Sequence, residues 1–243
     1  MKHVFRNHTH GSEIILSICE AKGAKYAKKS TYSKVGISEL QREFLGYSWY
    51  LNQQNHTISV KITNIEDIFF EIQIPFFEAK APVRKNITNN NLEFYVRAID
   101  HYNDVWCRSS RLNGMVHVHG DYSLDGNILF DDDNIFIIDW EHFHETFALR
   151  GFDVLYLIFE AIKISCGSKL PSRTVLNLGK KLIKYSFSIG ALDDAFFTNT
   201  FSNFLIEQER ISPIWTDQAV KIPTKQFSNK QLDIMLQYFN HIS

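Results

Sequence analysis

Two short apolar runs near the middle of the chain, residues 128–130 and 135–138, constrain its fold more than any other feature. The four residues between them, Asp131 to Asn134, are an acidic turn signal, and this run–turn–run pattern predicts a β-hairpin. A hairpin brings the start of its first strand and the end of its second strand to one edge. We therefore expect Asn127, which precedes the first run, and Asp139, which follows the second, to lie at that edge.

Asp121 adds a third oxygen-bearing side chain ahead of the hairpin. Carboxylate and amide oxygens are hard ligands suited to Mg²⁺, which takes few protein ligands and leaves room for phosphates. In kinase-type phosphoryl transfer, an Asn and a following Asp hold the metal while a separate Asp faces the substrate hydroxyl. On this chemistry, Asn127 and Asp139 are the expected metal ligands and Asp121 is the expected catalytic residue.

The stretch resembles the aminoglycoside phosphotransferase and choline kinase family of small-molecule kinases. The resemblance rests on His119-Gly120-Asp121, Asn127-Ile128-Leu129 and Ile138-Asp139-Trp140-Glu141. The family pattern has four residues between the first Asp and the Asn, whereas this chain has five, so Asp125 is an alternative or additional ligand. The resemblance implies an α+β, protein-kinase-like two-lobed fold, with a small antiparallel sheet in the N-terminal lobe and a mainly helical C-terminal lobe.

Residues 1–77 are the expected nucleotide-binding lobe. Leu40, Phe44, Tyr47 and Leu51 repeat at helical spacing and predict a helix over residues 37–53, with Ser38 as its N-cap. Period-two alternation predicts strands before and after it, with turns at Lys22-Gly23 and at residues 64–67 and a stop at Pro75. The predicted strands span residues 13–19, 24–30, 57–63 and 67–74.

Lys29 is the expected phosphate-binding lysine. In the family that the motif resembles, a strand of the N-terminal lobe carries such a Lys. Ala27 lies two positions earlier, on the same strand face, and leaves room for a nucleotide, which favours Lys29 over Lys28. Glu43, on the predicted helix, resembles the Glu that fixes this Lys, and Glu39 is the alternative partner.

The resemblance implies a hinge at about residues 76–84, where the backbone of Phe77, Glu78 and Ala79 would meet the adenine. Residues 78–243 are then the catalytic and acceptor-binding lobe. We expect a loop over residues 141–150, with His142, His144 and Glu145 in the cleft or simply in the loop. Asp153 is expected to be structural. The predicted helices span residues 91–107, 152–164, 172–189, 192–209 and 229–242, and the segment around Trp215 is a candidate lining of the acceptor pocket.

These assignments predict an enzyme, a kinase that uses ATP and Mg²⁺ to phosphorylate a hydroxyl of a small molecule or saccharide. The motif does not distinguish ATP from GTP, and a sugar or saccharide acceptor is favoured. The formal charge of −1 gives no support to nucleic-acid binding. Three scattered cysteines and the absence of a long apolar stretch predict a cytoplasmic protein without a transmembrane segment.

Two other functions stay open. A catalytically degenerate, pseudokinase-type binding protein would explain the extra loop residue and the lack of a Gly-rich phosphate loop. A zinc-dependent hydrolase is suggested by His117, His119 and Asp121, which alternate as in the opening of the metallo-β-lactamase-type motif. The further His of that motif is replaced here by Tyr122.

Overall fold

The computed structural model describes residues 2–6, 13–21, 23–54, 60–66, 68–82, 86–108, 115–211 and 227–241. The chain divides into two compact units. The first unit comprises Met1–Glu78 and Ile138–His144, and the second unit comprises Ala79–Ile137 and Glu145–Ser243.

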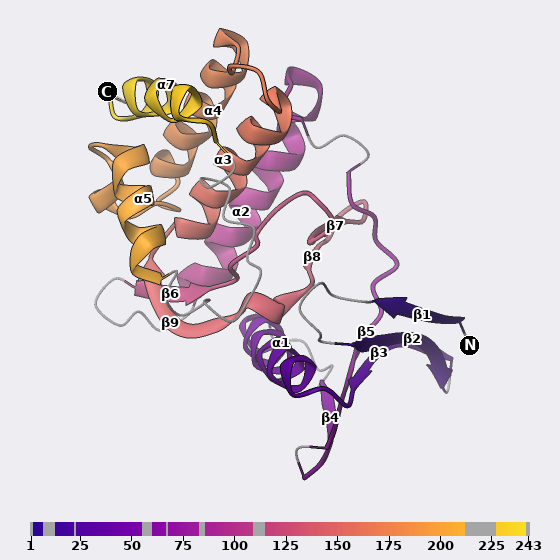
Figure 1. Ribbon diagram of the computed structural model, residues 1–243. Helices are drawn as coiled ribbons and strands as arrows, with labels where there is room; N and C mark the ends of the chain where they lie inside the picture. The colour runs from indigo at the N-terminus through magenta and orange to yellow at the C-terminus, as the bar shows by residue number, and fades with distance from the viewer. Residues whose placement is uncertain are drawn as a thin grey trace. The chain divides into compact units, whose positions relative to one another are not determined.

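The first unit contains a five-stranded antiparallel sheet in the order β1-β2-β3-β5-β4 (Figure 1). β1 was not expected from the sequence. β4 continues to Ile65, so the turn predicted at residues 64–67 is partly strand, while the predicted start of this strand at 57–59 lies outside the described residues. The strands are β1 Lys2–Arg6, β2 Ile14–Ala21, β3 Ala24–Thr31, β4 Lys61–Ile65 and β5 Phe69–Pro75.

One face of this sheet is buried. The register pairs Ala27 with Ile74 and Lys29 with Ile72, and all four side chains are buried. Helix α1, Lys34–Gln53, packs against β3 and β5. Because side chains alternate along a strand, Lys28 points to the opposite face, so the pleat alone separates the two neighbouring lysines.

Helix α1 begins earlier than predicted. Its N-cap is Ser33, whose hydroxyl accepts a hydrogen bond from the Gly36 N–H at 3.0 Å. The prediction of Ser38 was wrong, because residues 34–37 already have helical backbone and Ser38 instead accepts a hydrogen bond from Arg42. Ser33 and Ser38 are of the same residue type, which favours the N-cap position. Only the backbone conformation shows that Ser33 is the cap.

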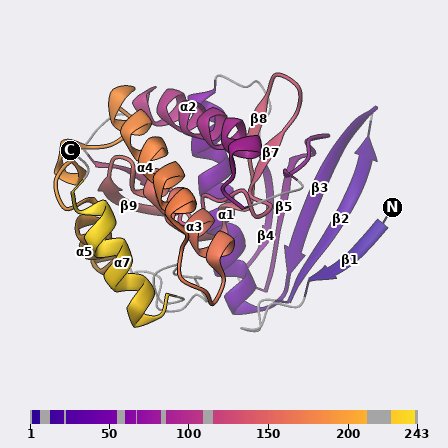
Figure 2. The same ribbon diagram turned by 90° about the horizontal axis from the view of Figure 1, so that it is seen from above.

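The second unit is mainly helical, as expected (Figure 2). Its core is built around the apolar helix α3, which packs against α2, α4 and α5. A cluster of aromatic rings closes this core, with Phe159 4.8 Å from Phe201 and 5.0 Å from Phe204 between ring centroids. The helices are α2 Leu92–Arg108, α3 Phe152–Cys166, α4 Arg173–Ser188, α5 Thr200–Ile211 and α7 Asn229–Phe239, with 3₁₀ turns η1 Asn89–Asn91 and η3 Asp194–Phe196.

The predicted hairpin is present in this unit. Strand β7, Ile128–Phe130, pairs antiparallel with β8, Ile135–Ile137, and Ile128 lies opposite Ile137. The chain enters the unit beside the hairpin, since Lys80 and Phe130 exchange backbone hydrogen bonds of 3.0 and 2.8 Å. The hairpin is thus anchored by a segment 50 residues earlier.

Two further predictions of local structure were wrong. The helix expected over residues 192–209 is interrupted between η3 and α5, where Asn199 adopts a left-handed φ of 54° that no helix continues through. The loop expected over residues 141–150 is mostly strand β9, His144–Leu149, which pairs with β6, Met115–Val118. The segment around Trp215 lies outside the described residues. No described helix is both long and apolar enough to cross a membrane.

Candidate active site

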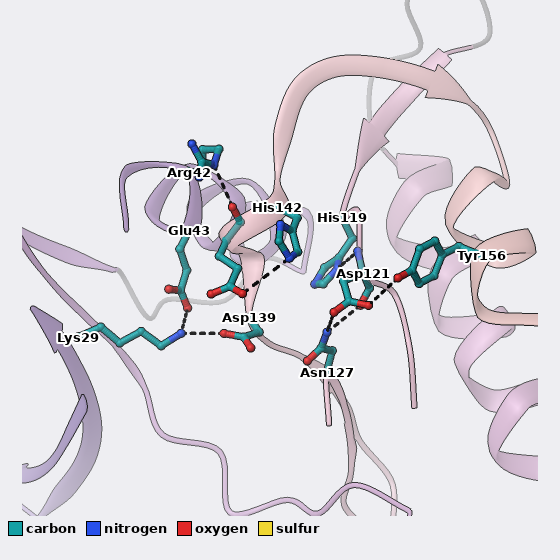
Figure 3. Close-up of polar contacts among 10 residues, drawn as sticks. Lys29, Arg42, Glu43, His119, Asp121, Asn127, Asp139, His142 and Tyr156 are labelled. Carbon is teal, nitrogen blue, oxygen red and sulfur yellow. Dashed lines mark hydrogen bonds and ion pairs between the residues drawn. The ribbon is translucent and has the colours of Figure 1, made fainter. Parts of the chain in front are cut away.

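A buried ion-pair cluster lies in the first unit, between the sheet and α1. The Lys29 Nζ donates to Glu43 Oε1 at 2.6 Å and to Asp139 Oδ1 at 2.8 Å (Figure 3). Lys29 comes from β3, Glu43 from α1, and Asp139 from the segment after β8. Glu43 is fully buried and Lys29 is 7% exposed, so the cluster is shielded from bulk water. Glu39, the alternative partner, makes no ion pair with Lys29 among the described contacts.

The charges of this cluster do not balance when all three groups are ionised. Burial favours the neutral amine, but the charges of Asp139 and Glu43 outweigh it and hold the pKa of Lys29 well above its ordinary value. Burial raises the pKa of Glu43 to about 7, against the attraction of Lys29. One cation faces two carboxylates, so proton uptake by Glu43 makes the cluster neutral.

Asp139 has an unusual backbone. Its φ of 65° and ψ of 56° lie in the left-handed region, which costs a non-glycine residue about 1–3 kcal/mol. Helix α1 holds this conformation, because the Tyr47 hydroxyl accepts from the Asp139 N–H at 3.3 Å and Arg42 Nε donates to the Glu141 carbonyl at 2.9 Å. The turn aims the Asp139 carboxylate at Lys29.

Helix α1 also accommodates the residues that follow Asp139. Trp140 is fully buried, and a Cβ on Gly46 would lie 2.6 Å from the Trp140 Cβ. Gly46 is therefore required by close packing. His142 lies in the 3₁₀ turn η2, Trp140–His142, with its Nε2 3.7 Å from Glu141 Oε1. The side chains of His144 and Glu145 are outside the described part of the structure.

A second polar cluster lies in the second unit, around Asp121. Asn127 Nδ2 donates to Asp121 Oδ2 at 2.9 Å and to the Asp121 carbonyl at 2.8 Å. The Tyr156 hydroxyl donates to Asp121 Oδ1 at 3.0 Å. The Asn127 nitrogen thus faces Asp121, and its oxygen Oδ1 is the atom that could bind a metal.

The extra loop residue does not separate Asp121 from Asn127. Gly126 takes a φ of 106° with open space around it, a conformation that glycine adopts without steric cost. The loop closes through the Ile128 N–H, which donates to the Ser123 carbonyl at 3.1 Å. Asp125 is exposed.

Asp153, at the start of α3, anchors the backbone before Asp121. Its Oδ2 accepts from the His119 N–H at 2.9 Å, and its Oδ1 accepts from the Gly120 N–H at 3.1 Å. Burial raises the pKa of Asp153 to about 7, although the two N–H donors favour the charged form. His119 Nδ1 accepts from the Asp121 N–H at 3.2 Å.

Tyr156 was missed at the sequence level. It lies three residues after Asp153 and therefore on the same face of α3. That spacing was the available signal, but an aromatic residue in an apolar helix predicts core packing first.

The two predicted metal ligands suit Mg²⁺ in their chemistry, since Asn127 Oδ1 and the Asp139 carboxylate are both hard oxygen donors. The zinc alternative has less support. Within the described ranges, no three or more His, Cys, Asp or Glu side chains group so as to hold a metal ion. The carbonyl of His117, a partly buried residue, accepts a hydrogen bond from Trp106 Nε1 at 2.7 Å.

Phe77, Glu78 and Ala79 lie in a segment without regular secondary structure, where the division between the units falls. The Glu78 carboxylate forms an exposed ion pair with Lys25. Nothing in these contacts tests the expected role of their backbone against adenine, which stays a prediction.

No protein-family model and no curated protein matches this sequence. Among solved structures, the chain is similar to an aminoglycoside phosphotransferase at 12% identity, with 90% of this chain and 94% of that chain covered and a TM-score of 0.42. It is also similar to a microcompartment-associated aminopropanol kinase (11% identity, 98% and 88% covered, TM-score 0.45). A spectinomycin phosphotransferase in complex with ADP and spectinomycin gives 14% identity, 97% and 92% covered, and a TM-score of 0.38. All three TM-scores are below 0.5.

Proposed function

We propose that this protein is a phosphotransferase that uses ATP and Mg²⁺ to phosphorylate a hydroxyl group of a small molecule or saccharide. The observation that carries the proposal is the buried Lys29 ammonium held between Glu43 and Asp139. A lysine that is buried with two carboxylates is a costly arrangement for stability alone. It is the arrangement expected of a cation that is kept in place for a nucleotide phosphate.

The Asp121 cluster supplies the second half of the proposal. Asp121 orients the acceptor hydroxyl by accepting its hydrogen bond. The acceptor oxygen then forms a bond to the γ-phosphorus, the bond between this phosphorus and the β–γ bridging oxygen breaks, and ADP leaves. The hydroxyl proton passes to Asp121 or to solvent. Lys29 stabilises the negative charge of the phosphates, so catalysis is mainly positioning and electrostatic stabilisation.

Asn127 and Asp139 would hold the metal. Mg²⁺, when bound, screens the charge of the nucleotide phosphates. Support for a shared role comes from the chain itself, because Asn127 directly precedes β7 and Asp139 follows the end of β8 by two residues. Asp125 is the less favoured ligand, since the Asn127 side chain contacts Asp121 and that of Asp125 is exposed.

The alternative is a nucleotide-binding protein of the same fold that has lost catalysis. The extra loop residue argued for it at the sequence level. The hydrogen bonds of Asn127 to Asp121 weaken that argument, because the longer loop still brings the two side chains together.

The first test is thermal unfolding with ATP or GTP, with and without Mg²⁺. At about 100 times its Kd, a ligand that binds only the folded state adds roughly 2.7 kcal/mol, which raises the Tm of a chain of this size by about 5–10 °C. We expect a rise that requires Mg²⁺. No rise with either nucleotide would contradict the proposal.

Lys28 provides the matched control. Lys28→Ala removes a half-exposed ion pair with Glu71 and should keep the nucleotide-dependent rise. Lys29→Ala should abolish the nucleotide-dependent rise in Tm, measured against the Tm of the same variant without nucleotide. Equal rises in Tm in the two variants would show that Lys29 does not contribute to nucleotide binding.

A further inference from the structure

Helix α3 presents two side chains to the loop that carries Asp121. Asp153 accepts hydrogen bonds from the backbone N–H groups of His119 and Gly120. Tyr156 donates its hydroxyl hydrogen to the next residue, Asp121 (Figure 3). The two side chains are three residues apart, so they lie on one face of the helix. One helical turn thus contacts three successive loop residues.

The Asp121 carboxylate has one donor on each oxygen. Tyr156 donates to Oδ1 at 3.0 Å and Asn127 donates to Oδ2 at 2.9 Å. Donors on both oxygens fix the rotation of the carboxylate about its Cβ–Cγ bond. Each oxygen keeps a further lone pair, so the carboxylate can still accept a hydrogen bond from a substrate hydroxyl.

We propose that Tyr156 is a positioning residue for phosphoryl transfer, which holds the Asp121 carboxylate in the orientation that receives the acceptor hydroxyl. This inference rests on the proposed function, in which Asp121 faces that hydroxyl. Asn127 makes only one hydrogen bond to the carboxylate, so without Tyr156 a single restraint on its rotation remains.

A tyrosine suits this role because it stays a donor. Tyr156 is 1% exposed, and burial together with the negative charge of Asp121 raises its pKa well above the ordinary value. Its hydroxyl therefore remains protonated throughout the neutral range, and the bond to Asp121 does not titrate away. The rigid ring also spans the distance from the helix to the loop with few rotatable bonds.

The test compares Tyr156→Phe with Tyr185→Phe in the 243-residue chain. Tyr185 also donates to an aspartate, Asp100, but this pair joins α4 to α2 and is no part of the proposed site. We expect Tyr156→Phe to lower kcat by about tenfold to hundredfold, the effect of losing one hydrogen bond to a charged group. The KM for ATP and the Mg²⁺-ATP-dependent rise in Tm should stay unchanged, because neither depends on the acceptor hydroxyl.

Tyr185→Phe should keep kcat within about twofold of the parent while losing a comparable hydrogen bond. A kcat for Tyr156→Phe within the same range would overturn the inference. So would a rise in the KM for ATP that accounts for the whole loss of kcat/KM, since that would make Tyr156 a determinant of nucleotide binding.

A spectroscopic measurement separates this inference from the proposed function. The ¹³C carboxyl resonance of Asp121, identified by its loss in Asp121→Asn, should move in Tyr156→Phe and not in Tyr185→Phe. An unmoved resonance would overturn the inference whatever the activity. If the parent protein transfers phosphate neither to water nor to choline, an aminoglycoside, an amino acid or a sugar, the proposed function fails, and the resonance alone decides whether Tyr156 holds the carboxylate.

Discussion

At the scale of single residues, Asp121 and Asp125 lie in the same loop and differ in their surroundings. Asp121 is held by Tyr156 and Asn127, whereas Asp125 is exposed. We expect Asp121→Asn to lower kcat by at least about 10³-fold, because an amide cannot take up the hydroxyl proton, and to keep the nucleotide-dependent rise in Tm. Asp125→Asn should change kcat by less than about threefold.

Steady-state phosphate transfer from labelled ATP checks both variants. Normal turnover by Asp121→Asn would remove Asp121 from the reaction. A loss of Mg²⁺-dependent activity in Asp125→Asn alone would instead make Asp125 the ligand contributed by the longer loop.

At the scale of elements, substitutions at Ser33 and Ser38 test where helix α1 begins. Ser33→Ala removes the acceptor for the Gly36 N–H and should lower the free energy of unfolding by about 1 kcal/mol. Ser38→Ala, inside α1, loses only a contact with Arg42 and should change it by less than about 0.5 kcal/mol. Urea unfolding followed by circular dichroism measures both, and a larger effect at Ser38 would contradict the assigned start of α1.

The stability that Asp153 contributes by anchoring the Asp121 loop to α3 depends on pH. The pKa of Asp153 is raised by burial to about 7, from an ordinary value near 3.8, so the folded state binds this proton more tightly than the unfolded chain does. The stability that it contributes is fully present below about pH 4 and is lost as the pH rises through about 7. Asn cannot titrate. Asp153→Asn should therefore lower the free energy of unfolding more at pH 5 than at pH 8, by about 2 kcal/mol.

The measurement is urea unfolding of the parent and of Asp153→Asn at both pH values. Ser38→Ala is the control, because it removes no titratable group and should therefore cost the same at pH 5 and at pH 8. A cost of Asp153→Asn that is equal at pH 5 and pH 8 would mean that the carboxyl of Asp153 is ionised throughout.

At the scale of the whole molecule, the first unit is discontinuous in sequence. Residues 138–144 belong to it, and Trp140 from this segment lies 5.2 Å from Tyr50 and 6.4 Å from Tyr47 between ring centroids. A fragment of residues 1–78 lacks this tryptophan, and losing a buried Trp costs about 3–5 kcal/mol, a large part of the stability of a small domain. We expect the fragment to be unfolded.

An amide NMR spectrum of the fragment, compared with that of the full chain, decides this. Poor dispersion is expected, and a well-dispersed spectrum with cooperative unfolding would show that residues 1–78 fold without Trp140. In the full chain, Trp140→Ala should lower the free energy of unfolding by a similar amount, about 3–5 kcal/mol.

Short-range sequence patterns were enough to predict the local features. Period-two alternation marked β2, β3 and β5, the acidic turn marked the β7–β8 hairpin, and residue chemistry selected Asp121, Asn127 and Asp139 as the oxygen-bearing side chains. These signals are short-range, because side-chain direction in a strand and turn preference depend on neighbours in the chain.

Which side chains meet depends on tertiary packing. Lys29 and Asp139 are 110 residues apart, and their contact depends on the pleat of β3 and on the left-handed turn at Asp139. The contact of Tyr156 with Asp121, 35 residues apart, likewise follows from how elements pack, which local pattern does not encode. Burial then set the pKa values of Glu43 and Asp153 near 7, because desolvation acts on a carboxyl only after the chain has closed around it.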